Sequence, residues 1–259
     1  MNLQLENKTA LITGSTKGIG FAIAKQLAAE GASVIINGRT DAAAKAAAQK
    51  IGSRACGVGA DVGTAAGCAE LLRQLPKVDI LVNNAGIFEP KPFAEIPDAD
   101  WDRFYQINVM SGVRLTRGYL PGMLSRNWGR VVFISSESGV QIPEEMIHYG
   151  MTKSSQLALV NGISQLTKGT GVTVNGVLPG PTASEGVTDF VNQLASGTGQ
   201  SQADFEKEFF RSVRPTSLLQ RFASVEEVAS LVVYLCSPLA SATNGAAMRA
   251  DGGVVRGTV

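Results

Sequence analysis

The sequence contains one histidine, three cysteines and almost no net charge, and each shortage excludes a class of protein. A single histidine, His148, cannot build a multi-histidine zinc site. The three cysteines are an odd number and form no Cys-x-x-Cys pair, so we expect no disulfide framework. A formal net charge of +1 gives no electrostatic basis for binding nucleic acid or a membrane surface.

Long apolar segments are also missing. No run approaches the roughly 18 apolar residues of a membrane-spanning helix, so we expect no membrane association. The first residues show no basic stretch followed by an apolar one, as a secretory signal would. With so few cysteines, the sequence predicts a cytoplasmic protein.

Glycine, by contrast, is abundant, with 29 residues, and short apolar runs alternate with longer stretches of helical periodicity. The apolar runs predict seven strands, at Thr9–Thr13, Ser33–Asn37, Arg54–Val58, Asp79–Val82, Arg130–Ile134, Val172–Val177 and Ala246–Arg249. The periodic stretches predict helices, among them Ile19–Glu30, 41–51 with Asp41 as its cap, Thr64–Leu75, Tyr149–Lys168 and Val225–Cys236. This alternation predicts one α/β domain over residues 1–259, a Rossmann-like, doubly wound parallel sheet of about seven strands with helices on both faces.

One segment interrupts the alternation. Residues 181–222 form a long insertion between the sixth predicted strand and the last helix. An excursion of this length on the ligand side of a sheet is typical of a lid over a binding site. Its apolar side chains either face that site, anchor the insertion or make a subunit contact; they are Phe190, Phe205, Phe209, Phe210 and Leu218.

A glycine-rich loop, Thr13–Gly20, connects the first predicted strand to the first helix. Gly14 permits a tight turn, Gly18 lets the backbone approach a pyrophosphate, and Gly20 permits close packing of the helix. The phosphates would bind the free N–H groups at the start of the helix. We therefore predict a dinucleotide site here, whose remaining loop residues are Ser15, Thr16, Lys17 and Ile19.

Five motifs in this order resemble the short-chain dehydrogenase/reductase family: Thr13–Gly20, Asn83–Gly86, Tyr149-x-x-x-Lys153, Pro179–Gly180 and Asp251–Gly253. The resemblance extends over nearly the whole chain. It implies a nicotinamide-dependent oxidoreductase that acts on a carbonyl or alcohol substrate, and many such relatives are 3-oxoacyl-carrier-protein reductases. It also implies a homotetramer.

Tyr149 and Lys153 are the predicted centre of the chemistry. Four residues apart on a helix, they share one face, with Cβ atoms roughly 6 Å apart. A nearby ammonium favours the phenolate and is expected to lower the pKa of Tyr149, which lets it exchange a proton with the substrate oxygen. Taken alone, the pair favours an exposed contact without functional consequence, because tyrosine and lysine often occur at this spacing by chance.

Ser136 lies just after the fifth predicted strand and can hold the substrate oxygen against Tyr149. Ser135 and Ser138 are the competing candidates; Ser135 is expected to point to the other face of the strand. By resemblance, Asn108 is the fourth catalytic residue, and it binds a water that connects to the lysine.

The end of the second predicted strand favours NADP(H) over NAD(H). An NAD enzyme usually has an acidic residue there, but no acid precedes Asp41. Arg39, helped by Lys17, can instead pair with a 2′-phosphate. By resemblance, further cofactor contacts come from Asp61, Val62, Asn83, Ala85, Gly86, Pro179, Gly180 and Thr182, together with Tyr149 and Lys153.

The substrate itself is not specified by these motifs. If Glu137, Glu144 and Glu145 face the cleft, they disfavour a free anionic substrate near them; the preferred interpretation is an ordinary solvated charge cluster. An acyl-carrier protein is acidic, and a basic dock for it can be sought among Arg114, Arg117, Arg126, Arg130 and Lys168. A non-catalytic dinucleotide-binding scaffold or sensor on the same fold is the alternative function.

Overall fold

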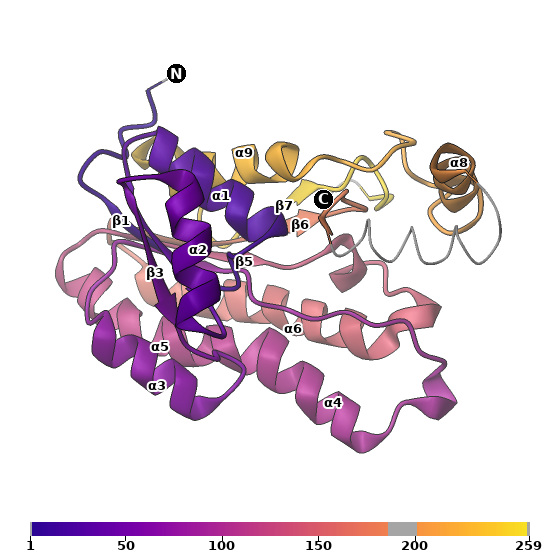
Figure 1. Ribbon diagram of the computed structural model, residues 1–259, viewed down its shortest axis with the longest axis horizontal. Helices are drawn as coiled ribbons and strands as arrows, with labels where there is room; N and C mark the ends of the chain where they lie inside the picture. Colours follow the sequence, from indigo (N-terminus) through magenta and orange to yellow (C-terminus); the bar gives the residue numbers. More distant parts are fainter. Residues whose placement is uncertain (1, 186–200, 258–259) are drawn as a thin grey trace.

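The computed structural model describes residues 2–185 and 201–257, which form a twisted sheet between two layers of helices (Figure 1). All seven strands are parallel, in the order β3-β2-β1-β4-β5-β6-β7. Their bounds are β1 Thr9–Ile12, β2 Ser33–Gly38, β3 Ala55–Gly59, β4 Ile80–Asn83, β5 Gly129–Ile134, β6 Val172–Pro179 and β7 Ala247–Ala250. The predicted doubly wound parallel sheet is confirmed.

Helices cover both faces of the sheet, which explains why its central strands are apolar on both sides. One face packs against α1 (Gly18–Ala29), α2 (Asp41–Ile51) and α9 (Val225–Cys236). The other packs against α3 (Ala65–Gln74), α5 (Ser111–Ser125) and α6 (Ile147–Ser164). Figure 1 shows α8 (Gln202–Ser212) standing apart from both layers.

Local polar residues set the helix boundaries, and one prediction about them was wrong. The cap of α2 is Thr40, whose side chain accepts a hydrogen bond from Ala43 N, and not Asp41. Asp41 is the first helical residue, and its carboxylate accepts a hydrogen bond of 2.6 Å from Gly59 N at the end of β3. Asp41 therefore ties α2 to the sheet, which a cap assignment from local sequence could not reveal.

Two features of the helices affect the site, and the first of them differs from the prediction. Helix α6 begins at Ile147, two residues early, so Tyr149 lies in its first turn. It ends at Ser164 and continues as a 3₁₀ turn over Gln165–Thr167. The helix before β5 consists of α4 (Asp98–Tyr105) and α5, which a π turn over Gln106–Met110 connects.

The strand order reverses between β1 and β4, because the chain runs outward through β2 and β3 and then returns beside β1. The loops that follow β1 and β4 therefore separate at the carboxyl edge of the sheet and leave a crevice. The glycine loop and Asn83–Gly86 both lie at this edge.

The described parts of the predicted 181–222 insertion also reach this edge. Phe205, Phe209 and Phe222 line a cavity there, as side chains that face the site would. Phe210 is buried against Phe209 and Phe222 and does not line the cavity, so it fits the anchoring alternative. Leu218 is 84% exposed. Phe190 lies outside the described residues.

Candidate active site

The glycine loop between β1 and α1 has a backbone that only glycine adopts easily. Gly14 and Gly18 have φ angles of +59° and +60°, where a side chain is strained. A Cβ on Gly14 would lie 3.0 Å from Ala85 Cα, and one on Gly20 would lie 2.4 Å from Asn84 Nδ2. Glycine is therefore required both for the turn and because the loop after β4 packs directly on it.

The start of α1 fits a bound pyrophosphate. Its N-cap residue, Lys17, makes no side-chain hydrogen bond to the helix, so the N–H groups of the first turn remain available to an anion. A Cβ on Gly18 would lie 3.5 Å from the Ser184 Cβ, and no other atom of the described residues comes within 4 Å of it. Lys17 is exposed beside this turn, and Arg39 is exposed after β2.

Three side chains hold the loop in shape, and the sequence prediction did not assign them to the site. Asn84 Nδ2 donates to the carbonyl oxygens of Thr13 and Gly14, at 2.9 and 3.0 Å. The buried Asn37 side chain accepts from Gly14 N and donates to the carbonyl oxygen of Ala60. Thr13 Oγ1 accepts hydrogen bonds from the backbone N–H groups of Asn84 and Ala85.

Two predicted cofactor contacts face the protein interior and are corrected here. Ser15 is fully buried beneath the loop, where its hydroxyl donates to Ile12 O and accepts from Asn37 N. The Asn83 side chain is buried and donates to Thr116 Oγ1 on α5. The Ser15 hydroxyl completes its hydrogen bonds inside the fold, whereas Asn83 Oδ1 is buried without a hydrogen-bond partner among the described residues.

Most other predicted cofactor residues lie along the open edge. Ile19, Gly86, Pro179, Gly180 and Thr182 line the cavity at the carboxyl ends of β1, β4 and β6. A Cβ on Gly86 would lie 3.6 Å from Lys153 Nζ, so this glycine keeps the path to the lysine open. The loop after β3 carries the exposed Asp61 and the buried Val62; Thr16 lies beside Gly38 at the end of β2.

Lys153 is buried within the first turns of α6, at the floor of the cavity. Its Nζ donates to the carbonyl oxygen of Ile134 at 2.8 Å and to Gln156 Oε1 at 3.3 Å. Burial lowers the pKa of Lys153 to about 7. This ammonium therefore exchanges its proton near neutral pH.

Asn108 lies in the π turn, and the structure gives its amide a full set of partners. Its Oδ1 accepts from Ile87 N at 2.8 Å, and its Nδ2 donates to Ile87 O and to Thr152 Oγ1. The backbone carbonyl oxygen of Asn108 accepts a hydrogen bond of 2.6 Å from Gln156 Nε2. Gln156, which the sequence prediction missed, thus connects Asn108 to Lys153.

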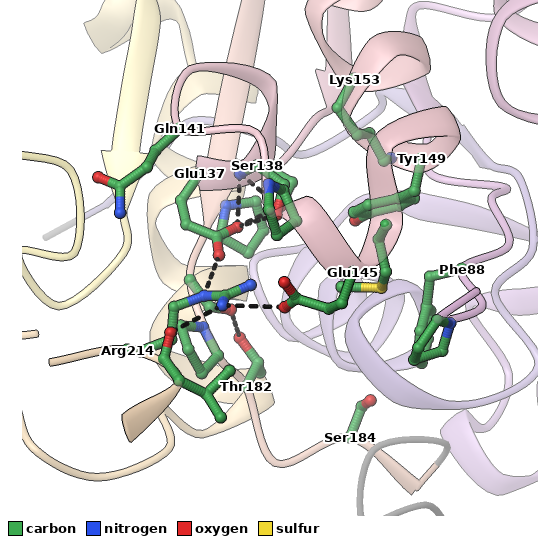
Figure 2. A pocket seen from close by; sticks show the side chains of 18 of the residues that line it. Phe88, Glu137, Ser138, Gln141, Glu145, Tyr149, Lys153, Thr182, Ser184 and Arg214 are labelled. Atoms are coloured by element: carbon green, nitrogen blue, oxygen red, sulfur yellow. Dashed lines mark hydrogen bonds and ion pairs between the residues drawn. The ribbon is translucent and has the colours of Figure 1, made fainter. Parts of the chain in front are cut away.

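Ser136 and Tyr149 lie on the same side of the cavity, and Figure 2 shows the Tyr149 ring next to Lys153 on α6. The serine alternatives are both engaged elsewhere. Ser135 Oγ donates to the backbone oxygen of Lys153, as its expected orientation away from Ser136 requires. Ser138 Oγ donates to Glu137 Oε2 at 2.8 Å.

The pKa of Tyr149 does not follow the prediction. Burial raises it above its usual value, while a hydrogen bond with Ser136 opposes that shift. Lys153 Nζ lies 5.5 Å from the centre of the Tyr149 ring, and its own ammonium is weakened by burial. In the protein as described, the phenol therefore keeps its proton.

The cavity has a volume of about 890 Å³, and both polar and apolar side chains line it. The polar ones include Ser136, Tyr149, Glu137, Glu145 and Arg214. The apolar ones include Phe88, Ile142, Met146, Phe205, Phe209 and Phe222. A ligand in this space would meet hydrogen-bonding groups and apolar surface together.

A family model of short chain dehydrogenases matches residues 8–195 of the chain. The chain belongs to the short-chain dehydrogenase/reductase family. It is 49% identical to the uncharacterized oxidoreductase YvaG of Bacillus subtilis, over 99% of both chains. It is 36% identical to D-beta-hydroxybutyrate dehydrogenase of Cupriavidus necator, over 97% of this chain and 99% of the relative.

Solved structures agree with this membership. L-sorbose reductase from Gluconobacter frateurii, in a complex with NADPH and L-sorbose, superposes with a TM-score of 0.91 at 31% identity. The match covers 99% of this chain and all of the other. This short-chain dehydrogenase/reductase is thus an oxidoreductase of a family that binds nicotinamide cofactors and acts on small molecules.

Two charged features of this family member differ from the prediction. Glu137 is not part of a solvated cluster: it is buried and pairs with Arg214 at 3.0 Å. Arg130 cannot contribute to a basic dock, because it is 2% exposed and donates to the carbonyl oxygens of Gly129, Gly171 and Ser237. The predicted basic surface therefore loses one of its four arginines.

His148, next to the catalytic tyrosine candidate, is buried between the rings of Trp101 and Phe104. Burial lowers its pKa, which favours the neutral ring. Across residues 2–185 and 201–257, no three His, Cys, Asp or Glu side chains gather as metal ligands. No helix in those ranges is long and apolar enough to cross a bilayer.

Proposed function

We propose that this short-chain dehydrogenase/reductase transfers a hydride between NADP(H) and a carbonyl/alcohol pair, with reduction of a ketone as the favoured direction. The observation that supports it is the convergence of Ser136, Tyr149 and Lys153 on one cavity that continues into the glycine loop. An NADPH bound there supplies the hydride. All other steps fall to side chains of this chain.

Tyr149 acts as the proton donor to the substrate oxygen, and its raised pKa keeps the phenol protonated until the reaction. Ser136 holds the same oxygen by a second hydrogen bond. As the carbonyl bond opens, its electron pair moves to the oxygen, which takes the phenol proton. Lys153, with a pKa of about 7, stabilises the resulting phenolate and returns a proton drawn from solvent. Asn108 positions this lysine through Gln156.

NADP(H) is favoured over NAD(H) on three grounds. Residues 36–40 contain no acid to accept the ribose hydroxyls, and Arg39 and Lys17 are both exposed at the crevice edge. L-sorbose reductase, a structural neighbour, holds NADPH. The 2′-phosphate would lie between these two cations, while the pyrophosphate binds the first turn of α1.

The substrate class is a small carbonyl or alcohol compound. Relatives with comparable coverage carry names that refer to hydroxybutyrate and to L-sorbose, both of which contain a reducible or oxidisable oxygen. A 3-oxoacyl thioester on an acyl-carrier protein is a further candidate, since a reductase of that class from Aquifex aeolicus is 33% identical to this chain. We also propose one domain over residues 1–259, a homotetramer and a cytoplasmic location.

The test is NADPH oxidation in the presence of ketones, followed at the nicotinamide absorbance. We expect Tyr149→Phe to lose at least about a hundredfold in kcat, because proton donation is typically worth that much, while NADPH binding by fluorescence stays intact. A non-catalytic scaffold or sensor predicts instead that the wild type reduces no ketone and that Tyr149→Phe changes nothing. That result would replace the enzyme proposal.

A further inference from the structure

Glu137, which follows Ser136 in the chain, places a buried carboxylate in the lining of the cavity (Figure 2). The Ser136 hydroxyl donates to Glu137 Oε2. The same oxygen accepts from Ser138 N at 2.6 Å and from Ser138 Oγ at 2.8 Å. Glu137 is 4% exposed, so these donors are what stabilise its charge.

Arg214 occupies the space between Glu137 and Glu145, as Figure 2 shows. Its Nε donates to Glu137 Oε1 at 3.0 Å, and its Nη1 donates to Glu145 Oε1 at 3.2 Å. The guanidinium is thus already paired with two carboxylates. It is therefore poorly suited to bind the carboxylate of a keto acid.

The charge of the described part of the cavity lining points the same way. Among residues 2–185 and 201–257, this lining contains two basic residues, Lys153 and Arg214, and four carboxylates, those of Glu137, Glu144, Glu145 and Glu208. An anionic substrate would enter a region of excess negative charge, and part of that charge is buried. The lining consequently favours a neutral substrate.

The Ser136 hydroxyl has one proton and cannot donate to Glu137 and to a substrate carbonyl at once. When the substrate carbonyl accepts the hydrogen bond from Ser136, Glu137 Oε2 loses one of its donors. A buried carboxylate whose hydrogen bonds are incomplete is costly in free energy. A substrate hydroxyl on the carbon next to the carbonyl would restore the donor. The two oxygens of such a substrate lie close enough together to face Ser136 and Glu137 simultaneously.

We propose that Glu137 is a specificity-determining residue that selects neutral α-hydroxyketones, and vicinal diols in the reverse direction. This inference rests on the proposed carbonyl reduction. The substrate hydroxyl donates to Glu137, which stays paired with Arg214, and the apolar side chains of the cavity lining contact the remainder of the molecule. Glu137 thereby distinguishes substrates that share the same reacting carbonyl.

Three phenyl ketones of similar size test it: 2-hydroxyacetophenone, propiophenone and benzoylformate. The first carries the hydroxyl, the second replaces it by a methyl group, and the third carries a carboxylate. We expect wild-type kcat/KM with NADPH to be at least about tenfold higher for 2-hydroxyacetophenone, as one charge-assisted hydrogen bond predicts. Equal or better use of propiophenone or benzoylformate would overturn the inference.

The variant Glu137→Gln keeps an acceptor for Ser136 but removes the charge. We expect the preference for 2-hydroxyacetophenone over propiophenone to fall about tenfold, because neutral hydrogen bonds are weaker. Use of benzoylformate should increase. Glu95→Gln, an exposed glutamate on the 3₁₀ turn Phe93–Glu95, is the matched control and should keep the wild-type ratios.

Arg214 would lose a partner in Glu137→Gln, so a second variant protects the test against misfolding. Glu137→Gln combined with Arg214→Gln leaves neither charge buried alone, and it should show the same loss of preference. Melting temperatures give a readout besides turnover: with NADP⁺ present, 2-hydroxyacetophenone should stabilise the wild type more than propiophenone does, and Glu137→Gln should abolish the difference.

The outcomes separate the two proposals. If the wild type reduces ketones but discriminates no differently from Glu137→Gln, the role of Glu137 is refuted and the oxidoreductase proposal stands. If no ketone is reduced and Tyr149→Phe behaves like the wild type, both proposals fail together.

Discussion

Lys153 is a buried lysine that has no carboxylate partner among the described residues. Its ammonium is stabilised only by the Ile134 carbonyl and the Gln156 amide. No ion pair to Lys153 occurs within the described part of the chain. Burial lowers the pKa of Lys153 to about 7, so a charged Lys153 reduces the stability of the folded protein. Such perturbed groups are common at functional sites.

This cost predicts a pH-dependent stability. Below pH 7 the native lysine is a buried cation; between about pH 7 and 10.5 the native form is neutral while the unfolded chain still binds the proton. The unfolded state binds more protons across this window, so stability rises with pH there. Lys153→Met removes the penalty and should raise the Tm of the free protein.

The gain should be larger at pH 6.5 than at pH 9.5, by at least ~2 °C, on the usual scale for a domain of this size. Thermal unfolding of both proteins at the two pH values measures it. Lys168→Met, at an exposed lysine, is the control and should show no such pH dependence. An equal gain at both pH values would contradict the assigned pKa shift.

Sequence reasoning finds residues whose chemistry lies in local spacing and misses those whose partners are distant. Tyr149 and Lys153 are four apart on one helix, so their proximity follows from helix geometry. Glu137 and Arg214 are 77 residues apart, and no local pattern predicts their pairing. Ser15 was assigned to the cofactor for its place in the loop, but the hydroxyl turns inward because Ile12 O and Asn37 N need partners.

At the scale of elements, the proposed preference for NADP(H) rests on the turn from β2 to α2. Thr40 caps helix α2, and Arg39 is exposed between the strand and the helix. Residues 36–40 offer no carboxylate to a ribose. Under the proposal, Arg39 pairs with the 2′-phosphate of the cofactor.

We expect Arg39→Ala to weaken NADPH binding about tenfold and to leave NADH binding unchanged, because only NADPH carries the phosphate. Competitive titration of the two cofactors gives both dissociation constants. Lys50→Ala, at an exposed lysine near the far end of α2, should alter neither. Tighter binding of NADH, insensitive to Arg39→Ala, would contradict the NADP(H) assignment.

Strands were predictable from sequence because continuous apolar runs mark positions buried on both faces. Their ends were less so: β6 extends to Pro179, two residues past the prediction, because backbone pairing with β7 continues there. The π turn at Gln106–Met110 could not be predicted either. Asn108, within this turn, makes side-chain hydrogen bonds to Ile87, which is 21 residues away in the sequence. No local sequence pattern predicts such contacts.

At the scale of the whole molecule, the fold brings five separate segments to one edge of the sheet. Loops after β1, β4, β5 and β6 converge with the segment after α8, and the cavity lies where they meet. Parallel strands guarantee that convergence, because all their carboxyl ends point the same way. The resulting space extends from Ile19 in the first turn of α1 to Tyr149 on α6.

The most direct test of hydride transfer follows the hydrogen itself. NADPH that carries deuterium at the transferable position of the nicotinamide C4 is supplied with a ketone that the protein reduces, and the alcohol is analysed by mass spectrometry and NMR. Direct transfer predicts one deuterium on the carbinol carbon and none on the hydroxyl, whose proton comes from Tyr149. An alcohol that lacks deuterium on that carbon would contradict the account.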